Sequence, residues 1–191
     1  MQKSFVFTGV VATLLLLCST SLAQKNEFAL TGGGQFSSNS AFDAGTSWAV
    51  GANYARRMAS APFVALYFEL PVVIGPKSVL RPYSTDYSSL FVTPGLKVKF
   101  APSFPLSPFF AAGVGFAHFR TSGTSTAGSE SRTNAVFDVG GGLDMKIAPF
   151  FSARAEVRDF YSGLPDFSLV GSGLSGRQHN VVPQVGLVFR F

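Results

Sequence analysis

Apolar and polar residues alternate along most of the chain, with a repeat of two residues. In the segment FFSARAEVR, residues 150–158, the apolar side chains from position 151 onward lie on one side, and Arg154, Glu156 and Arg158 lie on the other. The segment AVFDVGGGLDMKI, residues 135–147, shows the same pattern. A repeat of two over this length is typical of β-strands. Eight such segments follow residue 24, and none has a helical repeat, so the chain is predicted to be all-β.

The connections between these segments alternate between short and long. MASA at 58–61 and AP at 148–149 are short, whereas the connections at 37–45, 75–88, 121–132 and 162–178 are longer and rich in Gly, Ser and Pro. Long outer loops and short periplasmic turns are typical of membrane barrels. The sequence therefore predicts an eight-stranded antiparallel up-and-down transmembrane β-barrel. The connection APSFPLS, residues 101–107, is longer than such a turn requires and counts mildly against this architecture.

The polar face of the alternating segments indicates which side faces the lumen. A soluble barrel should present many Lys and Glu residues to water, but here the polar face is mainly Gly, Ala, Ser, Thr and Asn with scattered charges of both signs. An eight-stranded barrel has room only for side chains inside, where opposite charges can pair and offset their desolvation. We expect a lumen charge network of Glu27, Glu69, Lys97, Lys99, Asp138, Asp144, Lys146, Arg154, Glu156, Arg158 and Arg190.

The apolar face is then expected to meet lipid. Phe, Leu, Val and Ile suit the hydrocarbon region, and aromatic residues near strand ends suit the interfaces with the headgroups. A closed barrel satisfies all backbone groups in lipid, whereas a proline removes one donor from the ladder. Pro94 and Pro183 are therefore expected at β-bulges or above the membrane plane.

The N-terminus predicts export. Lys3 precedes an apolar run from Phe5 to Cys18, and a small-residue cleavage site follows, with Ala23 at the cut. This arrangement predicts a signal peptide at residues 1–23 and a barrel domain at residues 24–191. Cys18 leaves a lipoprotein site open, although Leu17 before it fits such a site poorly. Cleavage at residue 23 would leave a chain with no cysteine, and so with no disulfide.

Composition agrees with a membrane location and argues against nucleic acid as a partner. Charged residues make up 13% of the chain, about half of the ~25% usual in soluble domains. The formal net charge is +5, and no run of Lys and Arg could follow a phosphate backbone.

The last strand, VVPQVGLVFRF, carries a resemblance to a known family. Its alternating apolar residues and final Phe189 and Phe191 resemble the terminal strand of Gram-negative outer-membrane proteins. The whole chain after residue 23 resembles a stand-alone barrel of the OmpA/OmpX-like family. That resemblance implies a location in the outer membrane, recognition of Phe189 and Phe191 by the barrel-assembly machinery, contact with outer-membrane lipid and lipopolysaccharide, and a monomeric state.

Candidate chemistry is sparse. Some barrels of this type act on lipid A through a His–Ser pair, but the residue two positions after His118 is Arg120, and Ser122 lies four positions away. His179 is expected in the last loop, near Ser175 and Asp166. The glycine clusters are expected to serve close packing rather than phosphate binding, since no helix follows them. No cofactor and no metal site is expected.

Basic residues in the long connections are candidates for binding lipopolysaccharide phosphates: Lys77, Arg81, Arg120, Arg132 and Arg177. Ordinary solvation of the loops is the alternative, because acidic residues lie among them. The sequence therefore predicts a non-enzymatic barrel with a structural or surface-interaction role and a lumen plugged by mixed charges. A lipid A-modifying enzyme and a narrow porin-like channel remain open as alternatives.

Overall fold

The computed structural model describes residues 25–38, 43–80, 85–121, 131–163 and 177–191, except for the side chains at 43–45, 77–80, 85–87 and 121. The predicted signal peptide therefore lies outside the described residues. No helix among the described residues is long and apolar enough to cross a membrane. The strands are β1 (Asn26–Ser38), β2 (Asp43–Ser60), β3 (Val64–Leu80), β4 (Thr85–Val92), β5 (Gly95–Phe100), β6 (Leu106–Thr121), β7 (Ser131–Ala148), β8 (Phe151–Gly163) and β9 (Arg177–Arg190).

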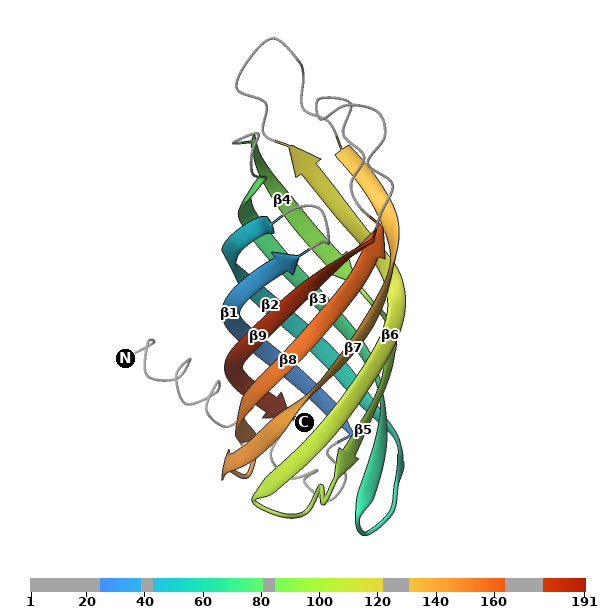
Figure 1. The fold of residues 1–191 in the computed structure, drawn as a ribbon. Helices are drawn as coiled ribbons and strands as arrows, with labels where there is room; N and C mark the ends of the chain where they lie inside the picture. Colours follow the sequence, from blue (N-terminus) through green and yellow to red (C-terminus); the bar gives the residue numbers. More distant parts are fainter. Residues whose placement is uncertain (1–24, 39–42, 81–84, 122–130, 164–176) are drawn as a thin grey trace, which may run out of the picture.

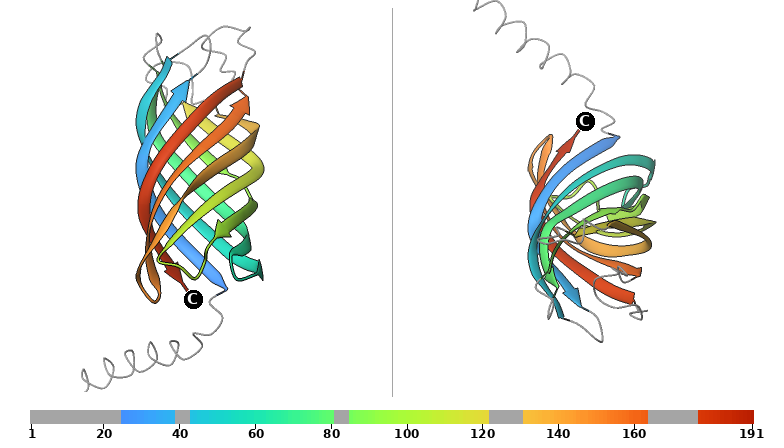
Figure 2. Two further views of the ribbon diagram at one scale, coloured as in Figure 1. Left: turned by 60° about the horizontal axis from the view of Figure 1, so that its bottom comes forward. Right: turned by 90° about the horizontal axis from the view of Figure 1, so that it is seen from above.

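These strands form one closed antiparallel barrel. Each strand pairs with the strands on either side of it in the ring, with β4 and β5 both between β3 and β6, and β1 pairs with β9, which closes the ring (Figures 1 and 2). The end that carries the turns at 61–63, 101–105 and 149–150 is called the lower end, and the opposite end is the upper end (Figure 1). Closure gives every strand two partners, so no edge is exposed to lipid.

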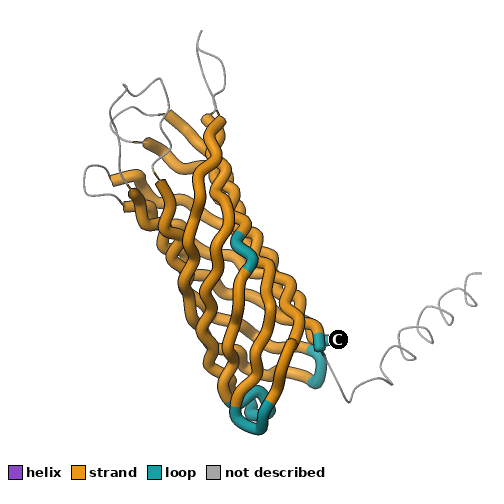
Figure 3. Tube along the Cα trace, turned by 90° about the vertical axis from the view of Figure 1, so that its right-hand side faces the viewer, coloured by secondary structure: helices purple, strands orange, loops and turns teal. Residues whose placement is uncertain are grey.

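The prediction of eight strands is confirmed, because β4 and β5 together form one wall of the barrel. Both pair with β3 on one side and with β6 on the other. The break between them falls at Thr93 and Pro94 and is visible as a short loop within the wall (Figure 3). The pairs Val72–Val92 and Glu69–Gly95 keep the same register across the break.

The bulges lie elsewhere than expected. Register shifts occur at 36–38 in β1, 57–59 in β2, 75–78 in β3 and 146–148 in β7. Pro183 and Pro94 shift no register, so the prediction of bulges at these residues is wrong. At Pro183 the β1–β9 ladder instead omits the pairs between Gly33–Gln184 and Phe36–Val181. The β1–β9 ladder can lose the backbone donor of Pro183 without forming a bulge, because Pro183 still pairs with Val157 on its other side.

The glycines at the β1–β9 seam allow the two backbones to approach closely. A Cβ on Gly33 would overlap the carbonyl oxygen of Pro183, and one on Gly186 would overlap that of Leu30. A larger residue at either position would push the first and last strands apart. The glycine cluster in β1 therefore serves packing, as the sequence predicted.

Candidate functional site

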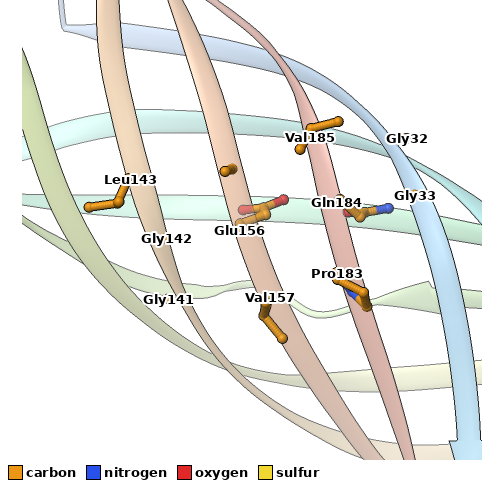
Figure 4. A pocket seen from close by; sticks show the side chains of 11 residues that line it. Gly32, Gly33, Gly141, Gly142, Leu143, Glu156, Val157, Pro183, Gln184 and Val185 are labelled. Carbon is orange, nitrogen blue, oxygen red and sulfur yellow. The ribbon is translucent and has the colours of Figure 1, made fainter.

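The outer wall of the barrel is apolar. Side chains that point away from the lumen remain exposed, with Leu187 at 56% and Val157 at 49% of their full accessible area. Other exposed apolar residues include Leu30, Trp48, Val50, Phe68, Leu96, Phe110, Val114, Leu143 and Val185. A shallow hollow of about 490 Å³ lies on this wall where Gly32, Gly141 and Pro183 provide little side chain (Figure 4). Such a surface is stable when it faces acyl chains rather than water.

The middle of the lumen is organised around one arginine. Arg158 contacts the carboxylates of Glu69 and Asp138 at 2.6 Å each, and that of Glu156 at 3.6 Å. Thr93 donates a hydrogen bond to Asp138 at 3.1 Å, and the amide of Asn53 donates one to Glu69 at 2.9 Å. Among the described residues, Arg158 is the cation in contact with all three carboxylates, and Arg154 reaches Glu156 at 3.9 Å from the lower part, so the middle of the lumen holds more carboxylates than cations.

The lower part of the lumen has the opposite balance. Glu27 contacts Lys97 at 3.0 Å and Lys99 at 2.5 Å, and it also lies within 4 Å of Arg154 and Arg190. Asp144 accepts two hydrogen bonds from Arg154, at 2.8 and 3.0 Å. Asp144 also lies 2.6 Å from Lys99 and 3.7 Å from Arg190. Two carboxylates here serve four cations, and Lys97 links the two parts by its 3.8 Å contact with Glu69.

The residues named from the sequence for a lumen charge network occupy these positions. All are buried except Lys146, which lies half-buried at the lower mouth, where its ammonium group donates to the carbonyl of Ser103 at 2.9 Å. Buried ions need partners, because desolvation would otherwise destabilise each of them by several kcal/mol. The alternation of the sequence identified the residues, but the pairing came only with the structure.

A second, apolar layer fills the upper part of the lumen. Phe91 stacks on Phe160 at 4.6 Å between ring centroids and meets Phe119 edge-to-face at 5.9 Å. All three rings are fully buried, and they form one cluster with Ala49, Val73, Ala117, Val136 and Val182. The sequence prediction of a lumen filled only by small residues and charges missed this cluster.

Part of the signal for this layer was present in the sequence. On β6 and β8 the pattern inverts near the upper end: Phe119 and Phe160 point inward, while His118, Arg120 and Asp159 point outward. Phe91 lies within the continuous apolar run LFV, and the repeat of two that places Thr93 and Lys97 inward places Phe91 inward as well. Inversion of the pattern is expected where a strand rises above the hydrocarbon region.

Amides and hydroxyls on β1 and β9 extend this upper layer. Ser37 donates to the amide oxygen of Asn180 at 2.8 Å, and Ser89 donates to that of Gln35 at 3.2 Å. Asn180 in turn donates to the carbonyl of Phe160 at 3.1 Å. These uncharged groups complete the packing of the upper lumen without any ion.

Both histidines lie on the outer face near the upper end. His118 contacts the hydroxyl of Thr133 at 2.8 Å. His179 contacts the carboxylate of Asp159 at 2.7 Å and packs against the ring of Tyr161 at 4.7 Å between centroids. His179 belongs to β9, so the expectation that it sits in the last loop is wrong; Ser122, Ser175 and Asp166 lie outside the described residues.

The basic residues proposed for lipopolysaccharide contact are only partly described. Arg120, Arg132 and Arg177 are exposed near the upper ends of β6, β7 and β9, so they belong to strands rather than to loops. Arg177 lies over the ring of Tyr161 at 5.4 Å. The Lys77 side chain and Arg81 lie outside the described part of the chain.

The terminal phenylalanines lie on the outer face at the lower end. Phe189 stacks with Phe191 at 5.5 Å between centroids and lies 5.3 Å from Phe151. The backbone of Phe191 exchanges two hydrogen bonds with that of Asn26, at 2.9 and 3.0 Å. The last residue therefore continues the pairing of β9 with β1. Among the described residues, no group of three or more His, Cys, Asp or Glu could hold a metal ion.

Comparison with known proteins gives the architecture a context. No family model and no curated protein matches the chain. Among solved structures, Neisserial surface protein A aligns with a TM-score of 0.70 and 15% identity, over 88% of this chain and 98% of that one. Ail of Yersinia pestis, in complex with the heparin analogue sucrose octasulfate, aligns with a TM-score of 0.53 and 13% identity, over 86% and 99% of the two chains.

An enzyme also shares the fold. The outer membrane enzyme PagL aligns with a TM-score of 0.51 and 16% identity, over 87% of this chain and 99% of that one. At these identities the similarity concerns the fold alone. The chain is an eight-stranded antiparallel β-barrel of the kind found in small outer-membrane proteins.

Proposed function

We propose that this protein is an integral outer-membrane barrel with a structural or surface-interaction role. The observation that carries the proposal is the inverted distribution of polarity: Leu187 and Val157 are exposed on the outer wall, while Arg158 is buried in the lumen. In water this arrangement would expose a large apolar surface, whereas in a bilayer each group meets a matching environment. Residues 1–23 would direct export as a cleaved signal peptide.

Spin labels test the proposed orientation. A label at Leu187 or Val157 should be accessible to oxygen and shielded from a water-soluble relaxation agent in lipid vesicles, since both positions face outward below the upper layer. A label at Thr133, which is exposed near the upper end, serves as the matched aqueous control. An aqueous signal at Leu187 and Val157 in barrels that migrate as folded on an unboiled gel would contradict the proposal.

Assembly would depend on the last strand. Phe189 and Phe191 are exposed and touch no part of the lumen, yet they end the strand that closes the barrel against β1. This supports recognition of the two rings by the barrel-assembly machinery before closure, and insertion as a monomer. The change Phe191→Ala should slow assembly catalysed by that machinery more than spontaneous folding into detergent. Equal effects on the two rates would argue for a purely structural role of the ring.

Surface interaction would occur at the upper end. Arg120 and Arg177 point outward and Arg132 is exposed; β6 and β7, which carry Arg120 and Arg132, are adjacent, and β8 separates them from β9, which carries Arg177. Guanidinium groups suit phosphates through paired hydrogen bonds, which supports contact with lipopolysaccharide. Replacing the three arginines by glutamine should weaken the dependence of thermal stability on lipopolysaccharide. Replacing Arg56, which is exposed at the lower end, is the matched control, and identical effects would contradict the assignment.

Channel activity is disfavoured by the filled lumen. The aromatic cluster of Phe91, Phe119 and Phe160 crosses the upper lumen, and the ion pairs fill the part below it. We therefore expect no steady ion conductance from the purified barrel in a planar bilayer. Steady conductance that responds to Phe91→Ala would support the channel instead.

A lipid-directed hydrolase is the second candidate, because one observation favours it. Asp159 bonds Nδ1 of His179, and Ser38 of β1 is the direct cross-strand partner of His179 on the same outer face. Directly opposed residues place their Cβ atoms about 5 Å apart. A base held by a carboxylate beside a hydroxyl is the arrangement that activates serine for attack on an ester carbonyl. Incubation with lipid A, followed by mass spectrometry, should show acyl loss that Ser38→Ala abolishes if this candidate is correct.

A further inference from the structure

A polar cavity of about 200 Å³ opens at the lower mouth of the barrel. Its floor consists of buried Glu27, Tyr67, Lys99 and Arg190. Its rim consists of Arg57, Ser60, Pro102, Ser103, Lys146 and Pro149, which are partly or fully exposed. The lining comes from β1, β2, β3, β5, β7 and β9, together with two of the turns at the lower end (Figure 1). We call this cavity the lower vestibule. No part of the proposed function uses it.

The charges of the lumen place an excess of positive charge at this vestibule. Across the lumen, Lys97, Lys99, Arg154, Arg158 and Arg190 balance Glu27, Glu69, Asp138, Asp144 and Glu156 in formal charge. The balance is uneven along the axis, however. Four cations lie within 4 Å of Glu27 or Asp144 below, whereas the carboxylates of the middle have, among the described residues, Arg158 and only the distant contacts of Lys97 and Arg154, at 3.8 and 3.9 Å. Arg57 and Lys146 add two further cations at the rim. Like charges confined in one small cavity repel unless an anion joins them.

Arg190 has unused donors beside this vestibule. Its side chain is 9% exposed, and its buried Nε and Nη2 atoms have no hydrogen-bond partner among the described residues. The nearest carboxylate oxygens lie 3.4 Å away in Glu27 and 3.7 Å away in Asp144, both of which are already engaged by shorter contacts. Buried guanidinium donors without acceptors are costly, and an oxyanion would satisfy two of them at once.

The turn that closes one side of the vestibule is longer than the connection of two strands requires, and it has an unusual backbone conformation. Residues 101–105 form the long connection that the sequence left unexplained. Ala101 adopts a φ of 47°, a left-handed conformation that is unfavourable for a non-glycine residue. The turn is held by Lys146, whose ammonium group donates to Ser103 and whose backbone N–H donates to Pro105. The turn therefore fixes a rim lysine beside the cavity.

We propose that the lower vestibule binds a phosphate-type oxyanion between Arg190, Lys146 and Arg57. The cavity volume suits a single phosphate group, and Ser60 and Tyr67 line the same space. Arg190 supplies two donors in one plane, and Lys146 and Arg57 supply charge from the rim. The anion could be free inorganic phosphate or the phosphate of a lipid headgroup. Access from the periplasm rests on the proposed outer-membrane orientation, whereas binding itself does not.

Nuclear magnetic resonance of the refolded barrel in zwitterionic detergent tests the site. Titration with inorganic phosphate at constant ionic strength should give saturable shifts of the Arg190 side-chain resonance and of the backbone amides at 101–104. Lys146→Met and Arg57→Gln should each raise the dissociation constant about tenfold, as loss of one charge-assisted contact implies. Arg120→Gln and Arg132→Gln, at the opposite end, should leave it unchanged.

Three outcomes would overturn the proposal. The first is no saturable shift, and the second is a dissociation constant that Lys146→Met and Arg57→Gln leave unaltered. The third is an equal loss of phosphate affinity in Arg120→Gln and Arg132→Gln. An unboiled gel confirms that each variant is folded. If Lys146→Met disturbs the turn, Arg57→Gln still tests the site, because that variant keeps the ion pairs of the floor.

Nanodiscs of phosphatidylglycerol or phosphatidylcholine without free phosphate distinguish the two sources of the anion. The same shifts in phosphatidylglycerol alone assign a lipid headgroup, and shifts only with added phosphate assign the free anion. Failure of the site would leave the spin-label test of orientation untouched.

Discussion

The lower and upper parts of the barrel solve the same packing problem with opposite chemistry. In the lower and middle lumen, ions such as Arg158 and Glu69 fill the interior, and apolar side chains such as Val157 form the outer wall. In the upper part of β6 and β8, Phe119 and Phe160 fill the interior, and polar residues stand outside. The backbone is the same ladder of antiparallel strands in both parts. The difference therefore reflects what lies outside the wall.

This difference indicates where the membrane ends. A polar outer face with an apolar interior is the arrangement of a soluble β-barrel, and it is stable only in contact with water or headgroups. Asp159 and His179 on the outer face would be strongly unfavourable in hydrocarbon. The upper boundary of the hydrocarbon region on β8 and β9 is therefore expected between Val157 and Asp159. The aromatic cluster then lies at or above that boundary.

The largest effect is expected in the ionic part. The change Arg158→Met removes the one cation that, among the described residues, contacts Asp138, and it leaves Glu69 with the more distant Lys97. Uncompensated buried carboxylates should lower the free energy of unfolding by ~3–5 kcal/mol. Urea unfolding in lipid vesicles, followed by the fluorescence of Trp48, measures this. A loss below about 1 kcal/mol would mean that water already screens the middle of the lumen.

Substitution in the aromatic cluster should lower the free energy of unfolding somewhat less. Phe91→Ala leaves a cavity between Phe119 and Phe160 and should cost about 3 kcal/mol in the same unfolding assay. Phe91→Leu retains most of the volume and is the matched control, with an expected loss of about 1–1.5 kcal/mol. Equal losses in the two variants would show that ring stacking, rather than volume, stabilises the upper lumen.

The outer wall offers a direct test of the boundary. Val185→Arg places a charge on the apolar wall opposite Ala155, between the lower end of β8 and the expected boundary, and should cost ~2–4 kcal/mol. Thr133→Arg, on the outer face near the upper end, should cost no more than about 1 kcal/mol. Similar costs at the two positions would remove the evidence for a boundary between the two parts.

The smallest effect is expected at the exposed pair on the upper outer face. The side chains of His179 and Asp159 are 53% and 29% exposed. Solvent-exposed ion pairs contribute roughly 0–1 kcal/mol, so Asp159→Asn should change unfolding by less than about 0.5 kcal/mol. A cost above 1.5 kcal/mol would show that the pair is part of the fold rather than an accessory group available for binding or chemistry.

Much of the architecture could be read from the sequence because a strand has a fixed repeat of two. The alternation in residues 135–147 and 150–158 gave strands and their outward faces, and alternating connection lengths gave the up-and-down order. The same repeat identified Arg154, Glu156 and Arg158 as inward-facing. The same repeat, extended from Lys97 through Thr93, places Phe91 inward, but it could not show which rings meet there.

What the sequence determined by itself was therefore which residues share a face, since that follows from local backbone geometry. Which residues meet across the lumen was decided only by closure of the barrel, which brings Arg158 from β8 to Glu69 in β3, 89 positions apart in sequence. Register and strand tilt set those distances, and neither is encoded within a single strand. For the same reason the excess of positive charge at the lower vestibule, the stacking of three distant phenylalanines and the His179–Asp159 pair were visible only in three dimensions.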